Sequence, residues 1–343
     1  MNWLEDPSLG IVKSVRPSQV AMSKRVEEIA ANGGIAFLEA ATGCGKSFAY
    51  LVPAIEHALA NDKRIVVSTA AKTLQDQLFT KDLPYLSEKV KKVSFAILKG
   101  KSNYLCELKT AQTIADGHEH ITSLPIYGQF RAWADETSYG DLSTFPGDIP
   151  FEYLVNVEEC VWKACSFSAE CGYLAAKKAA DQAQILVVNH HLLAYDLQTG
   201  GKKMLGDYDM LIVDEGHKLP EAIRSACESR FSLGTPKRLE KLLDKAGYKD
   251  AVGLREIQGV FGDLFHSLQS HQAGEWNARE HEVTLIKDAA RWAEHLRKIT
   301  VGDRTKLNEE ESDRKNIRKA SLTSFFYRFT KTCDALLDTD EEG

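Results

Sequence analysis

One glycine-rich run, EAATGCGKS at residues 39–47, constrains the fold of this chain more than any other feature. An apolar segment at 34–38 precedes it, and a helix-like segment at 48–52 follows it. A strand, a glycine-rich turn ending in Gly-Lys-Ser and a helix together are the context of a phosphate-binding loop. Gly43 and Gly45 would let backbone N–H groups point at phosphate oxygens, at the positive end of the helix. We therefore expect a nucleotide-binding domain rather than a turn that is glycine-rich by chance.

The residues of this loop have distinct expected roles. Lys46 would reach the β- and γ-phosphates of a nucleotide as a point charge, and the Ser47 hydroxyl would be a ligand of Mg²⁺. Thr42, Gly43 and Gly45 would supply the backbone that surrounds the phosphates. ATP and Mg²⁺ are the cofactors that this pattern predicts.

Four further apolar runs predict a parallel sheet, at residues 64–69, 93–98, 185–189 and 210–215. Continuous β-branched runs without polar alternation are typical of strands that are covered on both faces. Helix-like stretches separate the runs, for example at 72–78. The pattern indicates a doubly wound α/β domain, with its ligand at the carboxyl ends of the strands.

Asp214 and Glu215 follow the last of these runs. In a P-loop hydrolase, the carboxylate at such a strand end holds Mg²⁺, and its neighbour can orient and deprotonate the attacking water. Asp214 would take the first role and Glu215 the second. Acidic residues also mark strand ends in proteins of other function, but their combination with Lys46 and Ser47 favours the hydrolase.

Composition and charge limit the remaining possibilities. The chain has 343 residues, 43% of them hydrophobic and 27% charged, which is ordinary for a soluble protein of two or three domains. Its longest apolar stretches are strand-sized and its N-terminus lacks the features of an export signal, so we expect a cytoplasmic protein with no membrane partner. The net charge of −6 argues against coating of nucleic acid by bulk charge, but it does not exclude a local basic groove.

Seven cysteines, an odd number, make a disulfide scaffold improbable in a reducing compartment. Cys160, Cys165 and Cys171 form a C-x4-C-x5-C pattern, and Cys106 stands alone upstream. Four soft thiolates drawn from a long loop suit an iron–sulfur cluster. Structural zinc is the competing interpretation, although zinc sites favour tighter C-x2-C pairs. A metal-free set of buried cysteines is a third.

Five blocks of the chain resemble the DinG branch of the XPD/DinG superfamily 2 DNA helicases. The blocks are LEAATGCGKSFAYLVPA (38–54), VSTAAKTLQDQL (67–78), LKGKSNYLC (98–106), VVNHHLL (187–193) and LIVDEGHKLP (211–220). Their order and approximate spacing match over residues 14 to 230, and the DEGH form with the cysteine spacing favours DinG-like proteins over the XPD subgroup.

The resemblance implies roles for residues to which spacing alone assigns none. Arg16 and Gln19 correspond to a motif that contacts the adenine, the alternative for Gln19 being an exposed helix residue. Thr69 and Lys72 correspond to a motif that touches the DNA backbone, the alternative being a helix cap and a solvated lysine. His217 belongs to the motif that couples the nucleotide site to DNA.

The resemblance also implies the domain organisation. Residues 1–100 and 181–221 would form the first, RecA-like motor domain, with a parallel sheet. Residues 101–180 would be an inserted iron–sulfur module, in which Cys106, Cys160, Cys165 and Cys171 hold a 4Fe–4S cluster. Residues 222–343 would form a helical Arch-like domain.

The function implied by the resemblance is ATP-driven 5′→3′ translocation on single-stranded DNA, with unwinding of forked and other duplex DNA. No motif of a second motor domain is found, so we expect that domain in cis or in trans, and weak hydrolysis without unwinding by this chain alone. Two other classes stay open: a non-motor nucleotide- and DNA-binding module or half of a split helicase, and a regulatory P-loop ATPase unrelated to DNA.

Overall fold

The computed structural model describes most of the chain in two compact units. The described residues are 3–41, 43–110, 125–137, 139–149, 160, 163, 165–228, 232, 234–248, 252–271, 279–300 and 313–337. The first unit comprises residues 1–105, 129–148 and 171–228, and the second comprises 106–128, 149–170 and 229–343.

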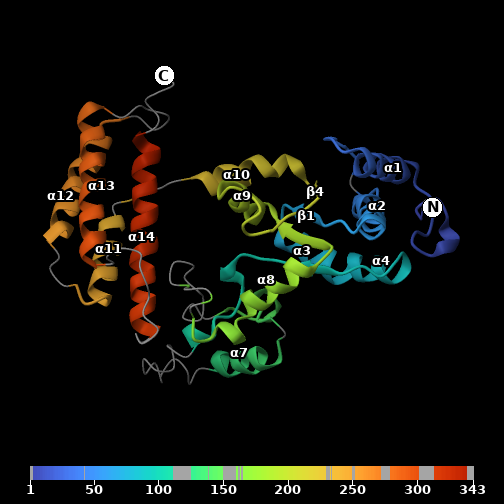
Figure 1. The fold of residues 1–343 in the computed structure, drawn as a ribbon, viewed down its shortest axis with the longest axis horizontal. Coiled ribbons are helices and arrows are strands. Elements are labelled where there is room, and N and C mark those ends of the chain that lie inside the picture. The colour runs from blue at the N-terminus through green and yellow to red at the C-terminus, as the bar shows by residue number, and fades with distance from the viewer. Residues whose placement is uncertain are drawn as a thin grey trace. The chain divides into compact units, whose positions relative to one another are not determined.

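A four-stranded sheet organises the first unit (Figure 1). Its strands are β1 (Ile65–Thr69), β2 (Phe95–Ile97), β3 (Ile185–Asn189) and β4 (Met210–Val213). Their order is β2-β3-β1-β4, and every neighbouring pair is parallel. All four carboxyl ends therefore lie at one edge of the sheet, and the predicted parallel α/β fold is confirmed.

Helices cover both faces of this sheet. Among the described helices of this unit are α1 (Pro17–Asn32), α2 (Lys46–Asn61), α3 (Lys72–Gln77), a π-helix (Leu78–Asp82), α4 (Leu83–Lys89), α8 (Gly172–Gln182), α9 (His190–Gln198) and α10 (Leu219–Cys227). Ile65 and Val67 of β1 pack into a core with α1, α2 and α4, whereas Val66 packs into a second core with α8 and α9. This alternation explains why the strand is buried at every position and apolar at 65–67.

The predicted strand at 34–38 is wrong. Residues 33–41 form no helix or strand, and Ile35 and Phe37 are 85% and 97% exposed. A strand exists only when a neighbour satisfies its backbone groups. Within the described residues, β4 pairs with β1 on one side only, and the segment at 34–38 does not pair with its other side, so its backbone lacks the ladder of a strand.

Residues 129–148 and α8 belong to the first unit, although their sequence suggests part of a separate module. The buried Lys99, which follows β2, joins this region to α3: its ammonium lies 2.6 Å from Asp76 and 2.8 Å from Asp141. Helix α7 (Pro125–Glu136) contributes Phe130, whose ring contacts Phe145. The division into three domains stays a prediction.

Four long helices lie in the described part of the second unit. They are α11 (Gly234–Lys245), α12 (Val252–Leu268), α13 (Glu280–Thr300) and α14 (Asp313–Leu337). Leu239, Ile257, Ala293 and Phe326, one from each helix, meet in its core. No helix in the described ranges is long and apolar enough to cross a bilayer.

Candidate nucleotide-binding site

The predicted phosphate-binding loop leads into the N-terminus of α2. Gly43 and Gly45 have φ angles of 78° and 86°, in the left-handed region that favours glycine. Lys46 is the first residue of the helix, and Gly45 caps it without a side-chain hydrogen bond. The first N–H groups of a helix have no partner inside it, so this end can bind an anion such as phosphate. Thr42 lies outside the described residues.

Two residues that precede the loop hold its backbone. Arg16 Nη1 donates to the carbonyl of Gly43 at 2.7 Å, and Gln19 Nε2 donates to the carbonyl of Gly45 at 2.9 Å. Gln19 is 3% exposed, so its alternative interpretation as an exposed helix residue is wrong. Its Oε1 is buried and has no hydrogen-bond partner among the described residues, which leaves one acceptor available at the loop.

The acidic pair lies beside the loop, at the carboxyl end of β4. The Asp214 N–H donates to the carbonyl of Ser68 at 2.8 Å, which extends the pairing of β4 with β1 by one residue. Glu215 has a φ of 57°, a left-handed conformation that costs a non-glycine residue about 1–3 kcal/mol and is concentrated at functional sites. Its Oε1 lies 3.6 Å from Lys46 Nζ. The fold therefore brings together the residues predicted for phosphate binding and for water activation.

Tyr50 and Asp82 also lie at this site, and sequence analysis missed both. The Tyr50 hydroxyl donates to Asp214 Oδ2 at 3.1 Å. Burial, followed by the charge of Asp214, raises the pKa of Tyr50 well above its usual range. Burial also raises the pKa of Asp82, which ends the π-helix, although interactions with Gln77 and Ser47 partly offset it. The spacing of Tyr50 three residues after Ser47 is the one signal in the sequence, whereas nothing there indicates Asp82.

The oxygen donors of this site fit Mg²⁺. Ser47 offers a hydroxyl, Asp214 offers a carboxylate, and both interact with the same buried Tyr50 hydroxyl. Mg²⁺ prefers hard oxygen ligands and is bound through one or two carboxylates together with substrate phosphates. Ser47 and Asp214 are the residues that would hold the ion.

A buried histidine connects the strands beneath the site. His190 is 1% exposed, and its Nδ1 lies 2.7 Å from the Ser68 hydroxyl. Burial lowers the pKa of His190, and the nearby backbone of Glu215 and Asp214 opposes that shift. The ring links the start of α9, directly after β3, to Ser68 of β1.

The residues expected to contact DNA are placed differently from one another. Thr69 is fully buried and donates to the carbonyl of Ala71. Lys72 is exposed at the start of α3, and its ammonium donates to Asn103 Oδ1 at 2.6 Å. His217 has an exposed side chain, and its Nδ1 lies 3.6 Å from Glu215 Oε2. Of these three, Lys72 and His217 present their side chains to solvent.

The four cysteines of the predicted cluster are present as partly exposed thiols. No group of three or more His, Cys, Asp or Glu side chains that could hold a metal ion occurs in the part of the chain that the structure describes. Leu105 and Gly172, the chain neighbours of Cys106 and Cys171, both contact the segment at residues 139–140. The Leu105 N–H donates to the carbonyl of Gly140, and a Cβ at Gly172 would lie 1.9 Å from the carbonyl of Tyr139.

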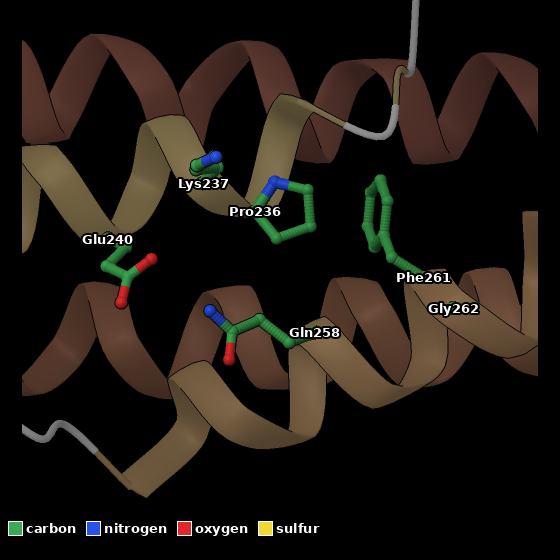
Figure 2. Close-up of a pocket in the computed structure, with 6 residues that line it drawn as sticks. All are labelled: Pro236, Lys237, Glu240, Gln258, Phe261 and Gly262. Atoms are coloured by element: carbon green, nitrogen blue, oxygen red, sulfur yellow. The ribbon is translucent and has the colours of Figure 1, made fainter.

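A separate hollow of about 330 Å³ lies in the second unit between α11 and α12 (Figure 2). Its lining residues are Pro236, Lys237, Glu240, Gln258, Phe261 and Gly262. The hollow is open and its polar groups do not converge on one point, so it has no evident chemistry of its own.

Comparisons with known proteins agree with this geometry. The DEAD/DEAH box helicase family matches residues 20–122. The ATP-dependent helicase DinG of Mycobacterium tuberculosis H37Ra is 35% identical over 279 residues, which cover 73% of this chain and 41% of that protein. The ATP-dependent DNA helicase YoaA of Escherichia coli K12 is 35% identical over 217 residues. Residues 20–122 therefore carry a DEAD/DEAH box helicase match, and the chain is similar to DinG and YoaA helicases over part of their length.

The DinG-like chain spans only part of these relatives. It covers 33% of the length of the Escherichia coli protein and 26% of a Bacillus subtilis relative that is named 3'-5' exonuclease DinG and is 30% identical. A solved chain titled XPD_Helicase aligns with a TM-score of 0.48 at 15% identity, over 96% of this chain and 52% of that chain.

Proposed function

We propose that this DinG-like chain binds ATP with Mg²⁺ and hydrolyses it as part of an ATP-dependent DNA helicase with 5′→3′ polarity. The observation that carries the proposal is the 3.6 Å approach of Glu215 to Lys46 at the N-terminus of α2. One residue binds the phosphates and the other acts on the water that attacks them. The relatives named ATP-dependent DNA helicases support DNA as the partner.

Each residue of the site has a part in this proposal. Lys46 and the N–H groups at the start of α2 bind the phosphates, with Arg16 and Gln19 holding the loop in shape. Mg²⁺, when bound, neutralises charge on the phosphate oxygens. Glu215 accepts a proton from the attacking water as general base. The left-handed backbone of Glu215 directs its carboxylate toward Lys46. When ATP binds, Lys46 exchanges this carboxylate for the phosphates.

The proposed DNA contacts lie at the same edge of the sheet. Lys72 is an exposed cation just beyond the carboxyl end of β1, and a lysine there binds a phosphate without reading sequence. Asp214 at the end of β4 is bonded to Ser68, which directly precedes Thr69. We propose that His217, 3.6 Å from Glu215, senses changes at the nucleotide site and transmits them to the DNA.

The same proposal includes a 4Fe–4S cluster on Cys106, Cys160, Cys165 and Cys171. It rests on the chemistry of four thiols and on the meeting of Leu105 and Gly172 at one segment. The test is the visible spectrum, with iron and sulfide content, of protein purified without oxygen. A colourless sample loaded with zinc would contradict the cluster.

Nucleotide and DNA measurements test the motor function. The chain is expected to bind a fluorescent ATP analogue in the presence of Mg²⁺, and Lys46→Ala is expected to abolish that binding. With a second motor domain, in cis or in trans, single-stranded DNA should stimulate hydrolysis, and duplexes with a 5′ tail should be unwound. DNA binding that ATP does not change would favour a non-motor module. Turnover that DNA does not change would favour a regulatory ATPase.

A further inference from the structure

The Tyr50 hydroxyl lies inside the nucleotide site, between the two residues that would hold Mg²⁺. Tyr50 follows Ser47 by three residues, so both side chains project from the same face of α2. The hydroxyl donates to Asp214 Oδ2 at 3.1 Å, and it also interacts with the Ser47 side chain. The phenol therefore connects the first turns of α2 with the end of β4.

Packing, rather than this hydrogen bond, fixes the position of the Tyr50 oxygen. The residue is 2% exposed and belongs to the core that α1, α2 and α4 form on the sheet. A ring held on all sides keeps a single rotamer, because protein interiors are close-packed. The hydroxyl is thus a rigid point against which the flexible Asp214 carboxylate can be oriented.

The direction of the hydrogen bond is also determined. A carboxylate can only accept, so the phenol must supply the proton. The proton stays on the phenol at neutral pH, since a tyrosine hydroxyl ionises only at about pH 10. One lone pair of Oδ2 is therefore occupied, and the remaining lone pairs of Asp214 can face an ion.

We propose that Tyr50 is a positioning residue of the Mg²⁺ site, which orients the Asp214 carboxylate toward Ser47 and so sets the affinity for the metal–nucleotide complex. The inference rests on the proposed function, since it requires ATP to bind here with Mg²⁺. Partners that orient a metal ligand typically contribute about 10–100-fold to metal affinity.

Tyr50→Phe tests this role, because it removes the hydroxyl and keeps the ring. Binding of a fluorescent ATP analogue is measured while Mg²⁺ is titrated. The half-saturating Mg²⁺ concentration is expected to rise about tenfold. Analogue binding in EDTA and the unfolding temperature should change little. Tyr85→Phe is the matched control: this tyrosine of the same unit stacks on Phe48, and its hydroxyl bonds to the Gly10 carbonyl rather than to a metal ligand.

A double-mutant cycle with Asp214→Asn provides a second test. In a chain that already carries Asp214→Asn, Tyr50→Phe should add no further change to the Mg²⁺ requirement, since the carboxylate that the phenol orients is gone. Additive effects, or a Tyr50→Phe loss of the same size with and without Mg²⁺, would assign a structural role and overturn the inference.

The parent chain separates failure of this inference from failure of the proposed function. If the parent binds MgATP and Tyr50→Phe has the same Mg²⁺ titration, the positioning role is wrong and the ATP site stands. If the parent binds no nucleotide under any condition, the proposed function is wrong and this inference falls with it.

Discussion

Lys46 Nζ lies 3.6 Å from Glu215 Oε1, so the structure pairs the proposed phosphate-binding cation with the proposed general base. The two side chains are 27% and 32% exposed, and partial exposure makes such a pair weak, about 0.2–1 kcal/mol. The pair can therefore separate easily when phosphates arrive. Glu215 is held near the loop by its backbone rather than by this ion pair.

Glu215→Gln should separate nucleotide binding from hydrolysis. Loss of the general base should lower the hydrolysis rate by about 100-fold or more. ATP affinity should stay or rise about two- to fivefold, because Lys46 no longer has an anionic competitor. Phosphate release and analogue binding measure the two effects. Glu221→Gln, an exposed site on α10, is the control, and equal losses of binding and hydrolysis would contradict the assignment.

Gly45→Ala should damage the loop more than Gly43→Ala. Both positions are left-handed, which strains any alanine by about 1–2 kcal/mol. A Cβ at Gly45 would also lie 2.2 Å from Gln19 Nε2, whereas one at Gly43 meets no heavy atom within 4 Å. The difference should appear in the unfolding temperature and in ATP affinity. In a chain that also carries Gln19→Ala, the unfolding temperature and ATP affinity of Gly45→Ala should approach those of Gly43→Ala. If Gly45→Ala and Gly43→Ala alone already give equal values, the contact with Gln19 has no consequence.

Lys72→Ala should weaken binding to single-stranded DNA equally for all sequences. Removal of one phosphate contact should lower the slope of log affinity against log salt by about 0.7. Anisotropy titrations at several salt concentrations measure this slope. Lys63→Ala is the control, because Lys63 precedes β1 at the opposite edge of the sheet and pairs with Asp209 at 2.9 Å. If Lys72→Ala has the same slope as the parent, Lys72 makes no contact with a DNA phosphate.

Glu282 should make the second unit sensitive to acid. Burial alone would raise its pKa, but hydrogen bonds from Ser267, the Arg279 N–H and His271 hold the pKa of Glu282 at about 2, below its usual 4.5. A carboxyl with a lowered folded pKa stabilises the fold above its unfolded pKa. That stability should be lost as the pH falls from 4.5 toward 2.

Glu282→Gln tests this assignment by removing the charge. The variant should be less stable at neutral pH and should lose part of the acid dependence between pH 4.5 and 2. Urea unfolding of the chain, followed by helical circular dichroism at several pH values, measures both. Glu280→Gln, at the exposed first residue of α13, should retain the acid dependence. If the dependence of stability on pH is unchanged in Glu282→Gln, protonation of other carboxyl groups causes the loss of stability in acid.

The sequence predicted the sheet well where apolar runs had parallel neighbours. The runs at 64–69 and 185–189 became β1 and β3, because both of their faces and both of their edges are covered. The equally apolar run at 34–38 did not become a strand. Strand formation depends on a neighbour that supplies hydrogen bonds, and a local pattern cannot report whether that neighbour is present.

The residues of the phosphate-binding loop could be predicted from the local sequence, because the turn and the start of one helix position Lys46 and Ser47. Their surroundings were decided by tertiary structure alone. Tyr50 meets Asp214 across 164 residues of sequence, and Gln19 meets Gly45 across 26. The sequence by itself determined which residues could bind phosphate and act on water. Only the packing of α1, α2 and β4 decided which side chains orient them, because such contacts depend on distances that no local spacing encodes.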